Sequence, residues 1–340
     1  MPRLLSWSAT PAVTDPKSRA PASPPLMSTL FEAPQEGAAA PSGDAAEGFV
    51  ARPFAERYAL VSQLGEGGMG EVWLLQDRQL DRNVALKTVR SDKRGVDSAS
   101  LFAHEVMLQA RLDHPAFVPV HEMGVAPSGE PYFTMRRVDG MSLSEALAAA
   151  KPDDLREQHR LLRAFAQVCA AVHFAHDRGV VHRDLKPSNV MLGAYGEVYV
   201  LDLGIAQRVQ RDTPTPPSEE LALDDAPSGK RPVARAGTPG YMAPEQHSAP
   251  GTVDSSADVY ALGCILFELL THRPLHSPDT LRERPLQEAY RVADPSPLHA
   301  VRGRADSLPV NRLLDDACQR ALSLDPVERT LSARDLHDCV

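Results

Sequence analysis

The segment Val181-His-Arg-Asp-Leu-Lys-Pro-Ser-Asn-Val-Met191 decides the fold, because it brings several chemically active groups together. Asp184 can orient a hydroxyl or accept its proton, and Lys186 can neutralise charge on a phosphate. Asn189 offers an amide oxygen to a hard cation such as Mg²⁺. A strand predicted at 197–201 then leads into Asp202-Leu-Gly204, whose carboxylate is another ligand that Mg²⁺ prefers. Together these groups predict a site for phosphate and a divalent cation.

Two further motifs lie upstream of this segment. Gly65-Glu-Gly-Gly-Met-Gly70-Glu-Val72 joins two predicted strands, and glycines let a backbone lie over phosphates. Alone, a glycine-rich hairpin turn explains this pattern equally well, and the strand that follows it excludes a Rossmann fingerprint. If the motif Val84-Ala-Leu-Lys87 is considered alone, the side chain of Lys87 is expected to point to solvent. Glu105 lies in the middle of the next predicted helix, and a lysine held by a glutamate can be aimed at a phosphate.

The order of predicted elements changes along the chain from strands to helices. The first part predicts strands and one helix, with strands at 58–64, 71–76, 83–89, 117–123 and 131–138 and the helix at 98–112. The second part is mostly helical: Ser142-Leu-Ser-Glu145 forms a capping box, and helices are expected at 155–178, 255–271, 309–322 and 332–340. This order predicts an α+β fold with two lobes.

Residues 1–53 differ in composition from the rest, being rich in Pro, Ala and Ser without helical or strand periodicity. Such a segment cannot bury enough apolar surface to offset its ordering entropy, so it is predicted to be a disordered tail. The domain prediction is therefore a tail over 1–53 and one domain over 54–340. That domain is predicted to consist of an N-lobe of about 54–138 and a C-lobe of about 139–340.

Bulk composition sets limits on the class of protein. Of the 340 residues, 43% are hydrophobic and 24% charged, as in ordinary globular proteins, and the net charge is −9. That charge argues against a general nucleic-acid binder. The four cysteines lack zinc-ligand spacing and are expected to be reduced thiols. No apolar run is long enough for a membrane span, so no span is expected.

With these motifs in place, the chain from about Tyr58 onward resembles the protein kinase superfamily, in its bacterial, eukaryotic-like (Hanks-type) Ser/Thr branch. The resemblance implies the two-lobed kinase fold, a cytoplasmic location, and ATP with Mg²⁺ as cofactors. It also implies the residues that contact ATP: Leu64, Gly65, Glu66, Gly67, Gly68, Met69, Gly70, Val72, Ala85, Lys87, Met135, Val138 and Met191.

The same resemblance assigns the reacting groups. Asp184 matches the catalytic aspartate and Lys186 its neighbour, while Lys87 matches the phosphate-binding lysine and Glu105 its ion-pair partner. Asn189 and Asp202 match the Mg²⁺ ligands. In the C-lobe, the segment 237–245 matches the substrate-docking element. Glu245 is expected to pair with Arg329, and Asp258 is expected to tie down the catalytic loop.

The sequence departs from the family pattern at a few positions. Leu203 replaces the usual phenylalanine after Asp202, and Gln109 is polar where an apolar residue is common, which would loosen the helix carrying Glu105. Arg136 and Arg137 form an unusual pair in the hinge, and the sequence alone does not explain them.

The expected function is transfer of the γ-phosphate of MgATP to Ser or Thr hydroxyls of protein substrates, in bacterial signalling. Lys186 and Thr238 favour this class over tyrosine kinases, and the docking element disfavours a small-molecule kinase. Autophosphorylation is expected between Thr213 and Ser228. The alternative is a pseudokinase scaffold that binds nucleotide without phosphoryl transfer. The oligomeric state and the physiological substrate stay open.

Overall fold

A computed structural model describes residues 52–66, 70–89, 96–203, 206–208, 237–304, 306–329 and 331–340. The predictions for the tail before residue 52, for Gly67, Gly68, Met69 and Gly204, and for the segment between Thr213 and Ser228 lie outside these residues. The contacts divide the chain into two compact units. The first comprises the described residues up to Asp113 together with Val118–Met141, and the second comprises His114–Phe117 and Ser142–Val340.

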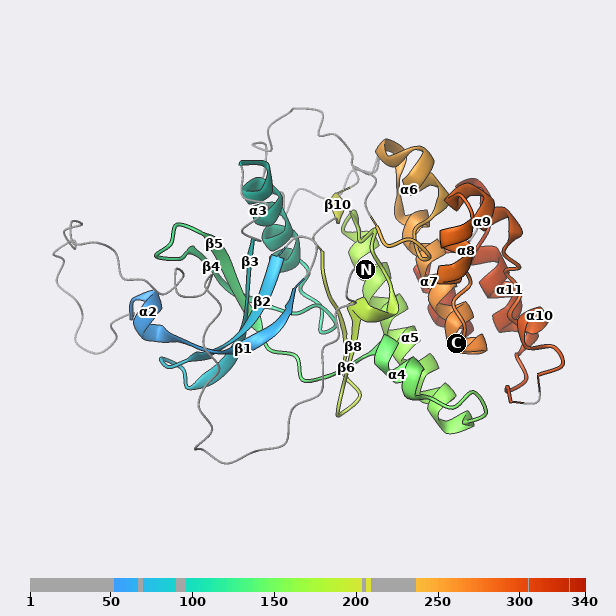
Figure 1. Cartoon of the computed structure of the whole chain (residues 1–340), viewed down its shortest axis with the longest axis horizontal. Coiled ribbons are helices and arrows are strands. Elements are labelled where there is room, and N and C mark those ends of the chain that lie inside the picture. The colour runs from blue at the N-terminus through green and yellow to red at the C-terminus, as the bar shows by residue number, and fades with distance from the viewer. Residues whose placement is uncertain are drawn as a thin grey trace. The chain divides into compact units, whose positions relative to one another are not determined.

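The first unit is built on a five-stranded antiparallel sheet with the order β1-β2-β3-β5-β4 (Figure 1). Its strands are β1 (Tyr58–Glu66), β2 (Gly70–Asp77), β3 (Arg82–Val89), β4 (Val120–Val125) and β5 (Pro131–Arg136). Two helices accompany the sheet, the short α2 (Phe54–Arg57) and the longer α3 (Val96–Arg111).

Two hydrophobic clusters hold this unit together. One lies around β1, β2 and β3 and is made of Tyr58, Trp73, Leu75, Val84, Leu86, Ala126 and Tyr132. The other joins α3 to the sheet, because Phe102 and Val106 of α3 pack against Phe133 of β5. The Phe102 and Phe133 rings lie 5.4 Å apart between centroids. Burying these side chains fixes α3 on the sheet, and α3 carries Glu105.

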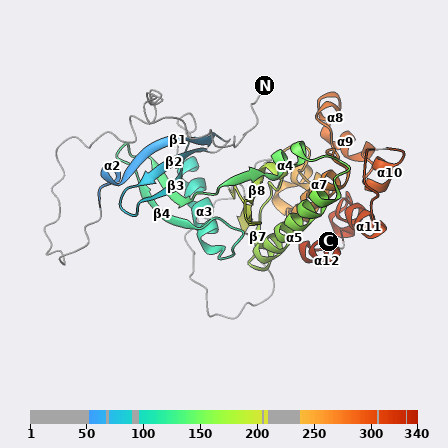
Figure 2. The same cartoon turned by 90° about the horizontal axis from the view of Figure 1, so that it is seen from below.

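The second unit is mainly helical and contains a few short strands (Figures 1 and 2). Its helices are α4 (Leu143–Ala149), α5 (Leu155–Asp177), α6 (Pro244–Ser248), α7 (Ser255–Thr271), α8 (Pro278–Glu283), α9 (Leu286–Val292), α10 (Pro297–Val301), α11 (Arg312–Ala321) and α12 (Ala333–Cys339). Its strands are β7 (Val180–Val181), β8 (Val190–Gly193), β9 (Val198–Val200) and β10 (Gln207–Arg208), and β6 (Gly140–Ser142) lies where the chain enters this unit.

Helix α7 forms the centre of the second unit. It is apolar on nearly all sides, begins after the side-chain cap of Asp254, and is almost completely buried. Gly263 lets α11 approach closely, because a Cβ there would lie 3.0 Å from the Ala321 Cβ and from the Leu322 Cγ. Cys318 reaches the Gly263 carbonyl at 3.5 Å, and it is a free, buried thiol, as expected from the sequence.

Most long elements match the sequence prediction, as do the short strand β9 and the short helix α4, whereas several other short helices were missed. The capping box of Ser142 and Glu145 is present, and α7 has the predicted bounds. Strand β4 begins at Val120 rather than at residue 117, because Phe117 instead forms a parallel bridge to Val200 in the second unit. Helices α2, α6, α8, α9 and α10 were not predicted. Within the described parts of the chain, no helix is long and apolar enough to cross a membrane.

Candidate active site

The loop after β7 is anchored to α7 through a buried carboxylate. Asp258 accepts hydrogen bonds from the backbone N–H groups of His182 and Arg183, each at 2.8 Å, and contacts His176 Nε2 at 2.8 Å. Burial raises the pKa of Asp258, but the hydrogen bond from His176 and the nearby imidazoles outweigh it and hold the pKa below its ordinary value. Arg183 adopts a positive φ of 70°, so this anchor fixes an uncommon backbone conformation directly before Asp184.

The carbonyl oxygen of Arg183 is held by a different element from the one that holds its N–H group. The buried side chain of Gln246, in α6, donates a hydrogen bond of 2.8 Å to the Arg183 carbonyl oxygen and accepts one of 2.9 Å from the Ala243 N–H. The backbone of Arg183 is therefore fixed by Asp258 at its N–H and by Gln246 at its carbonyl. The sequence interpretation missed Gln246, although its position directly after Pro244-Glu245 could have marked it as part of the α6 N-terminus.

Asp184 lies in a compact hydrogen-bonded group with Lys186 and Thr238. Its Oδ1 accepts a bond of 2.6 Å from the Thr238 hydroxyl, and its Oδ2 accepts one of 2.8 Å from Lys186 Nζ. Lys186 Nζ also donates to Thr238 Oγ1 at 2.6 Å. A carboxylate, an ammonium group and a hydroxyl thus meet at one point, where they can orient an incoming hydroxyl and stabilise negative charge.

Asn189 connects this group to the segment that carries Asp202. Its side-chain nitrogen donates to the Asp184 carbonyl at 2.9 Å and to Asp184 Oδ2 at 3.3 Å, which leaves the amide oxygen available as a ligand. The Asn189 carbonyl accepts a bond of 2.8 Å from the Leu201 N–H. Asp202 follows with an exposed side chain and a φ of 65°. Asn189 and Asp202 are the two residues expected from the sequence to bind Mg²⁺, and amide and carboxylate oxygens are ligands that this ion prefers.

The described residues contain no group of three or more His, Cys, Asp or Glu side chains arranged for a metal ion.

In the first unit, Lys87 and Glu105 form a buried ion pair. Lys87 lies in β3, opposite Val72 of β2 and Phe133 of β5, and Glu105 reaches it from α3. A Cβ at Gly70 would lie only 2.4 Å from the Thr88 carbonyl oxygen, so a glycine is required where β2 approaches β3. The ion pair expected between Lys87 and Glu105 is present. It holds the ammonium group of Lys87 in a fixed position in the middle of the sheet.

The remaining positions expected around ATP are distributed over both units. In the first unit, Leu64, Gly65 and Glu66 lie in β1, Gly70 and Val72 in β2, Ala85 in β3, Met135 in β5, and Val138 follows β5. In the second unit, Met191 lies buried in β8.

Gln109 behaves differently from the expectation that it would loosen α3. It is buried, and its amide donates a hydrogen bond of 2.8 Å to the Val118 carbonyl and contacts Met135 Sδ at 3.8 Å. The polar group is therefore satisfied, and it fastens α3 to the segment before β4 rather than loosening it.

The segment 237–245 of the second unit, which is expected from the sequence to dock substrate, is held by a buried ion pair. Arg329 meets both carboxylate oxygens of Glu245, one of them at 2.8 Å, and also donates to the Ser323 carbonyl at 2.6 Å. The pairing of Glu245 with Arg329 expected from the sequence is thus confirmed. Nearby, the Tyr241 hydroxyl donates to Glu268 at 2.6 Å, and the Tyr290 hydroxyl donates to the Met242 carbonyl at 2.8 Å. The second bond holds the Met242 carbonyl directly, and the first holds the side chain of its neighbour Tyr241 against Glu268 of α7.

Comparison with known proteins agrees with this arrangement. Residues 58–336 match the family model described as "Protein kinase domain". The chain therefore belongs to the protein kinase family, and its β-rich first unit and helical second unit are the two lobes of that fold.

Curated bacterial relatives give a closer comparison. The chain is 36% identical over 287 residues to the serine/threonine-protein kinase PknB of Mycolicibacterium smegmatis and 35% identical over 289 residues to PknB of Mycobacterium tuberculosis. It is 34% identical over 302 residues to the serine/threonine-protein kinase PknD of Chlamydia felis. Each match covers 83% of this chain, but only 42% of the PknB proteins and 30% of PknD. The chain thus spans less than half the length of these relatives.

Proposed function

We propose that this chain is an ATP-dependent serine/threonine protein kinase that transfers the γ-phosphate of MgATP to Ser or Thr hydroxyls of protein substrates. The single observation that carries the proposal is the hydrogen-bonded group of Asp184, Lys186 and Thr238. It is supported by membership of the protein kinase family and by similarity to bacterial serine/threonine-protein kinases.

In this proposal, Asp184 orients the acceptor hydroxyl and receives its proton, while Lys186 neutralises charge that develops on the transferred phosphate. The anchors of Asp258 and Gln246 on Arg183 hold the loop in place before substrate arrives. Little covalent chemistry is asked of the protein, so catalysis consists of positioning and electrostatic stabilisation. The fixed backbone of this loop supplies that positioning.

The nucleotide is assigned to the positions that the family resemblance implies. Lys87, held by Glu105, is proposed to bind the phosphates. The glycine-rich segment 65–70 is proposed to cover the phosphates. The residues that sandwich adenine are proposed to be Leu64, Val72, Ala85 and Met191, with Met135 at the gatekeeper position and Val138 in the hinge. Mg²⁺ fits Asn189 and Asp202, and when bound it would neutralise charge on the phosphate oxygens.

A second proposal concerns the regulation of the proposed kinase activity. The Thr and Ser residues between Thr213 and Ser228 belong to the part of the chain that the structure does not describe, so their assignment as autophosphorylation sites rests on the sequence. Replacing Thr213, Thr215, Ser218 and Ser228 with alanine, followed by phosphatase treatment and re-incubation with ATP, tests it. Reduced peptide phosphorylation is expected, whereas full activity would overturn the regulatory role.

The pseudokinase alternative receives no support from the observations, because Lys87, Asp184, Asn189 and Asp202 are all present. Protein substrates are the proposed partners, and the cytoplasmic location stays a prediction. The test is to incubate the purified chain with labelled ATP, Mg²⁺ and a mixed peptide library, and to map the label by mass spectrometry. Labelled serine and threonine residues are expected. Label on tyrosine alone would contradict the proposed class.

A further inference from the structure

Gln109 and Glu105 lie one helical turn apart on α3, so their side chains leave the same side of the helix. Both side chains are buried. Glu105 pairs with Lys87 of β3. The side-chain nitrogen of Gln109 donates a hydrogen bond of 2.8 Å to the Val118 carbonyl and contacts Met135 Sδ at 3.8 Å. One face of α3 therefore carries two polar attachments to the rest of the first unit.

The acceptor of the Gln109 hydrogen bond is held independently of α3. Val118 is buried and directly follows Phe117, which forms a parallel bridge to Val200 in the second unit. The Val200 N–H also donates a bond of 2.7 Å to the Ala116 carbonyl. Because these contacts fix the segment before Val118, the Val118 carbonyl is an anchor to which Gln109 fastens the helix.

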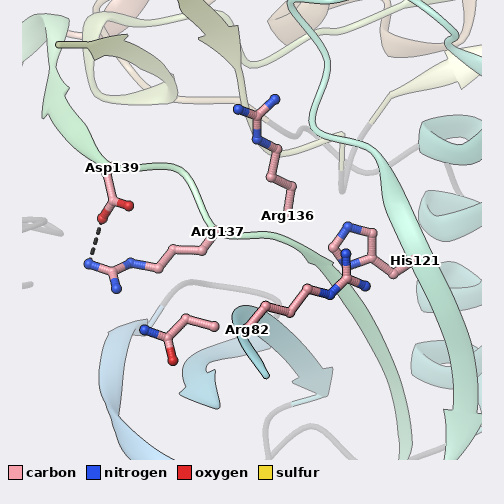
Figure 3. Close-up of a pocket in the computed structure, with 6 residues that line it drawn as sticks. Arg82, His121, Arg136, Arg137 and Asp139 are labelled. Atoms are coloured by element: carbon pink, nitrogen blue, oxygen red, sulfur yellow. Dashed lines mark ion pairs between the residues drawn. The ribbon is translucent and has the colours of Figure 1, made fainter. Parts of the chain in front are cut away.

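The second contact of Gln109 reaches the strand next to β3. Met135 of β5 pairs with Ala85 of β3, two residues before Lys87, and it packs on the face of the sheet that carries α3. The next residue of β5, Arg136, faces the other side of the sheet, because successive side chains of a strand alternate. Arg136 lines a pocket at the end of the sheet with Arg82, Asn83, His121, Arg137 and Asp139 (Figure 3). Gln109 does not line this pocket, so its contacts form a separate attachment.

We propose that Gln109 is a positioning residue that acts through Glu105 on Lys87 and thereby strengthens nucleotide binding. The proposal rests on the proposed assignment of Lys87 to the nucleotide phosphates. An apolar residue, which is common at this position, would hold α3 only by packing, and packing has no preferred direction. A hydrogen bond is directional, and a satisfied buried polar group favours one arrangement over its alternatives. The bond from Gln109 thus keeps α3 from turning or sliding, and Glu105 keeps the Lys87 ammonium group in place.

The test uses the full chain and the variant Gln109→Met, which has a side chain of similar length but cannot donate to the Val118 carbonyl. Affinity for a fluorescent ATP analogue with Mg²⁺ is measured by anisotropy. Gln109→Met is expected to weaken binding by about three- to tenfold, which corresponds to the net contribution of one hydrogen bond. Tyr58→Phe is the matched control, because it removes a side-chain hydrogen bond of 2.5 Å to Glu122 in the same unit and should leave the affinity unchanged.

A double-mutant comparison shows whether Gln109 acts through Glu105. In the background of Glu105→Gln, the group that connects α3 to Lys87 has lost its charge, so Gln109→Met should cause little further loss of affinity. A purely structural role would weaken binding by the same factor in both backgrounds, and that result would contradict the proposal.

Hydrogen exchange of the α3 backbone amides gives a readout that needs no nucleotide. Exchange should be faster in Gln109→Met than in the unchanged chain, and Tyr58→Phe should not change it. If the unchanged chain binds no analogue but exchange responds as expected, the nucleotide assignment fails, whereas the placement of the Lys87–Glu105 pair by Gln109 is supported. The proposal is overturned if Gln109→Met binds the analogue as well as or better than the unchanged chain, or if exchange in α3 does not change.

Discussion

The Thr238 hydroxyl donates a hydrogen bond of 2.6 Å to Oδ1 of Asp184, joining two residues that lie 54 positions apart in the sequence. Because Lys186 Nζ bonds to both, the loop that would carry out the chemistry and the element that would dock the substrate meet at one hydroxyl group. The placement of Thr238 depends on Gly237, which precedes it with a φ of 141° and lies close to the Arg183 carbonyl and the Gln246 side chain.

Replacing Thr238 with valine should lower peptide phosphorylation by about ten- to a hundredfold, because the change keeps the shape but removes a hydrogen bond to a charged group at the proposed catalytic centre. Thr238→Ser is the matched control and should retain most activity, since it keeps the hydroxyl. Steady-state kinetics with one peptide substrate compares the two variants. Equal activity of the valine and serine variants would show that the hydroxyl is dispensable.

The buried pair of Glu245 and Arg329 should be a main source of stability in the second unit. Removing one partner leaves an uncompensated buried charge, so Arg329→Ala is expected to lower the free energy of unfolding by about 3–5 kcal/mol. Arg284→Ala breaks an exposed pair with Glu288 and should cost less than about 1 kcal/mol. Urea unfolding of both variants measures the difference, and similar losses would contradict this account.

Stability should fall between about pH 6.5 and pH 4 because of His276. This imidazole contacts the Tyr260 hydroxyl at 2.8 Å and packs against Tyr290, and burial lowers its pKa from 6.5 to about 4. The unfolded chain gains a proton below pH 6.5, but the folded protein does not until about pH 4. The free energy of unfolding therefore decreases across this window, by roughly 3 kcal/mol from this group.

The variant His276→Gln tests the assignment, because it keeps a polar group near Tyr260 but cannot titrate. Its free energy of unfolding should depend less steeply on pH over the same window, whatever its absolute value. Equal slopes for the variant and the unchanged protein would show that other groups cause the acid sensitivity.

The boundary of the folded part can be placed with two deletions. Removing residues 1–51 should leave the melting temperature nearly unchanged, as expected for the predicted tail. Removing residues 1–57 should lower stability by about 1–3 kcal/mol, because Phe54 packs against Tyr58 and Tyr132 and Arg57 pairs with Asp77 and Glu122. Calorimetric melting of both deletion variants measures how much stability each deletion removes. A drop of several degrees for the shorter deletion would instead show that the tail docks on the domain.

The sequence predicted the fold well where signals were long or chemically distinctive. The apolar run at 255–271 marked a buried helix, and the paired groups Lys87 and Glu105 could be matched through the family motifs. Features that depend on tertiary contacts were not predictable. Phe117 joins the second unit through Val200, and Gln246 becomes important only because the chain brings it to the Arg183 carbonyl. Gln109 likewise looked like a defect until its partner, the Val118 carbonyl, was known.

The most direct measurement of the central claim is the rate of phosphate transfer from labelled ATP to a Ser/Thr peptide by the unchanged chain and by Asp184→Asn. The isosteric change removes the carboxylate that accepts from Thr238 and Lys186, so the rate should fall by orders of magnitude while the melting temperature stays close to that of the unchanged chain. A rate for Asp184→Asn near that of the unchanged chain would contradict the assignment of Asp184 as the catalytic residue.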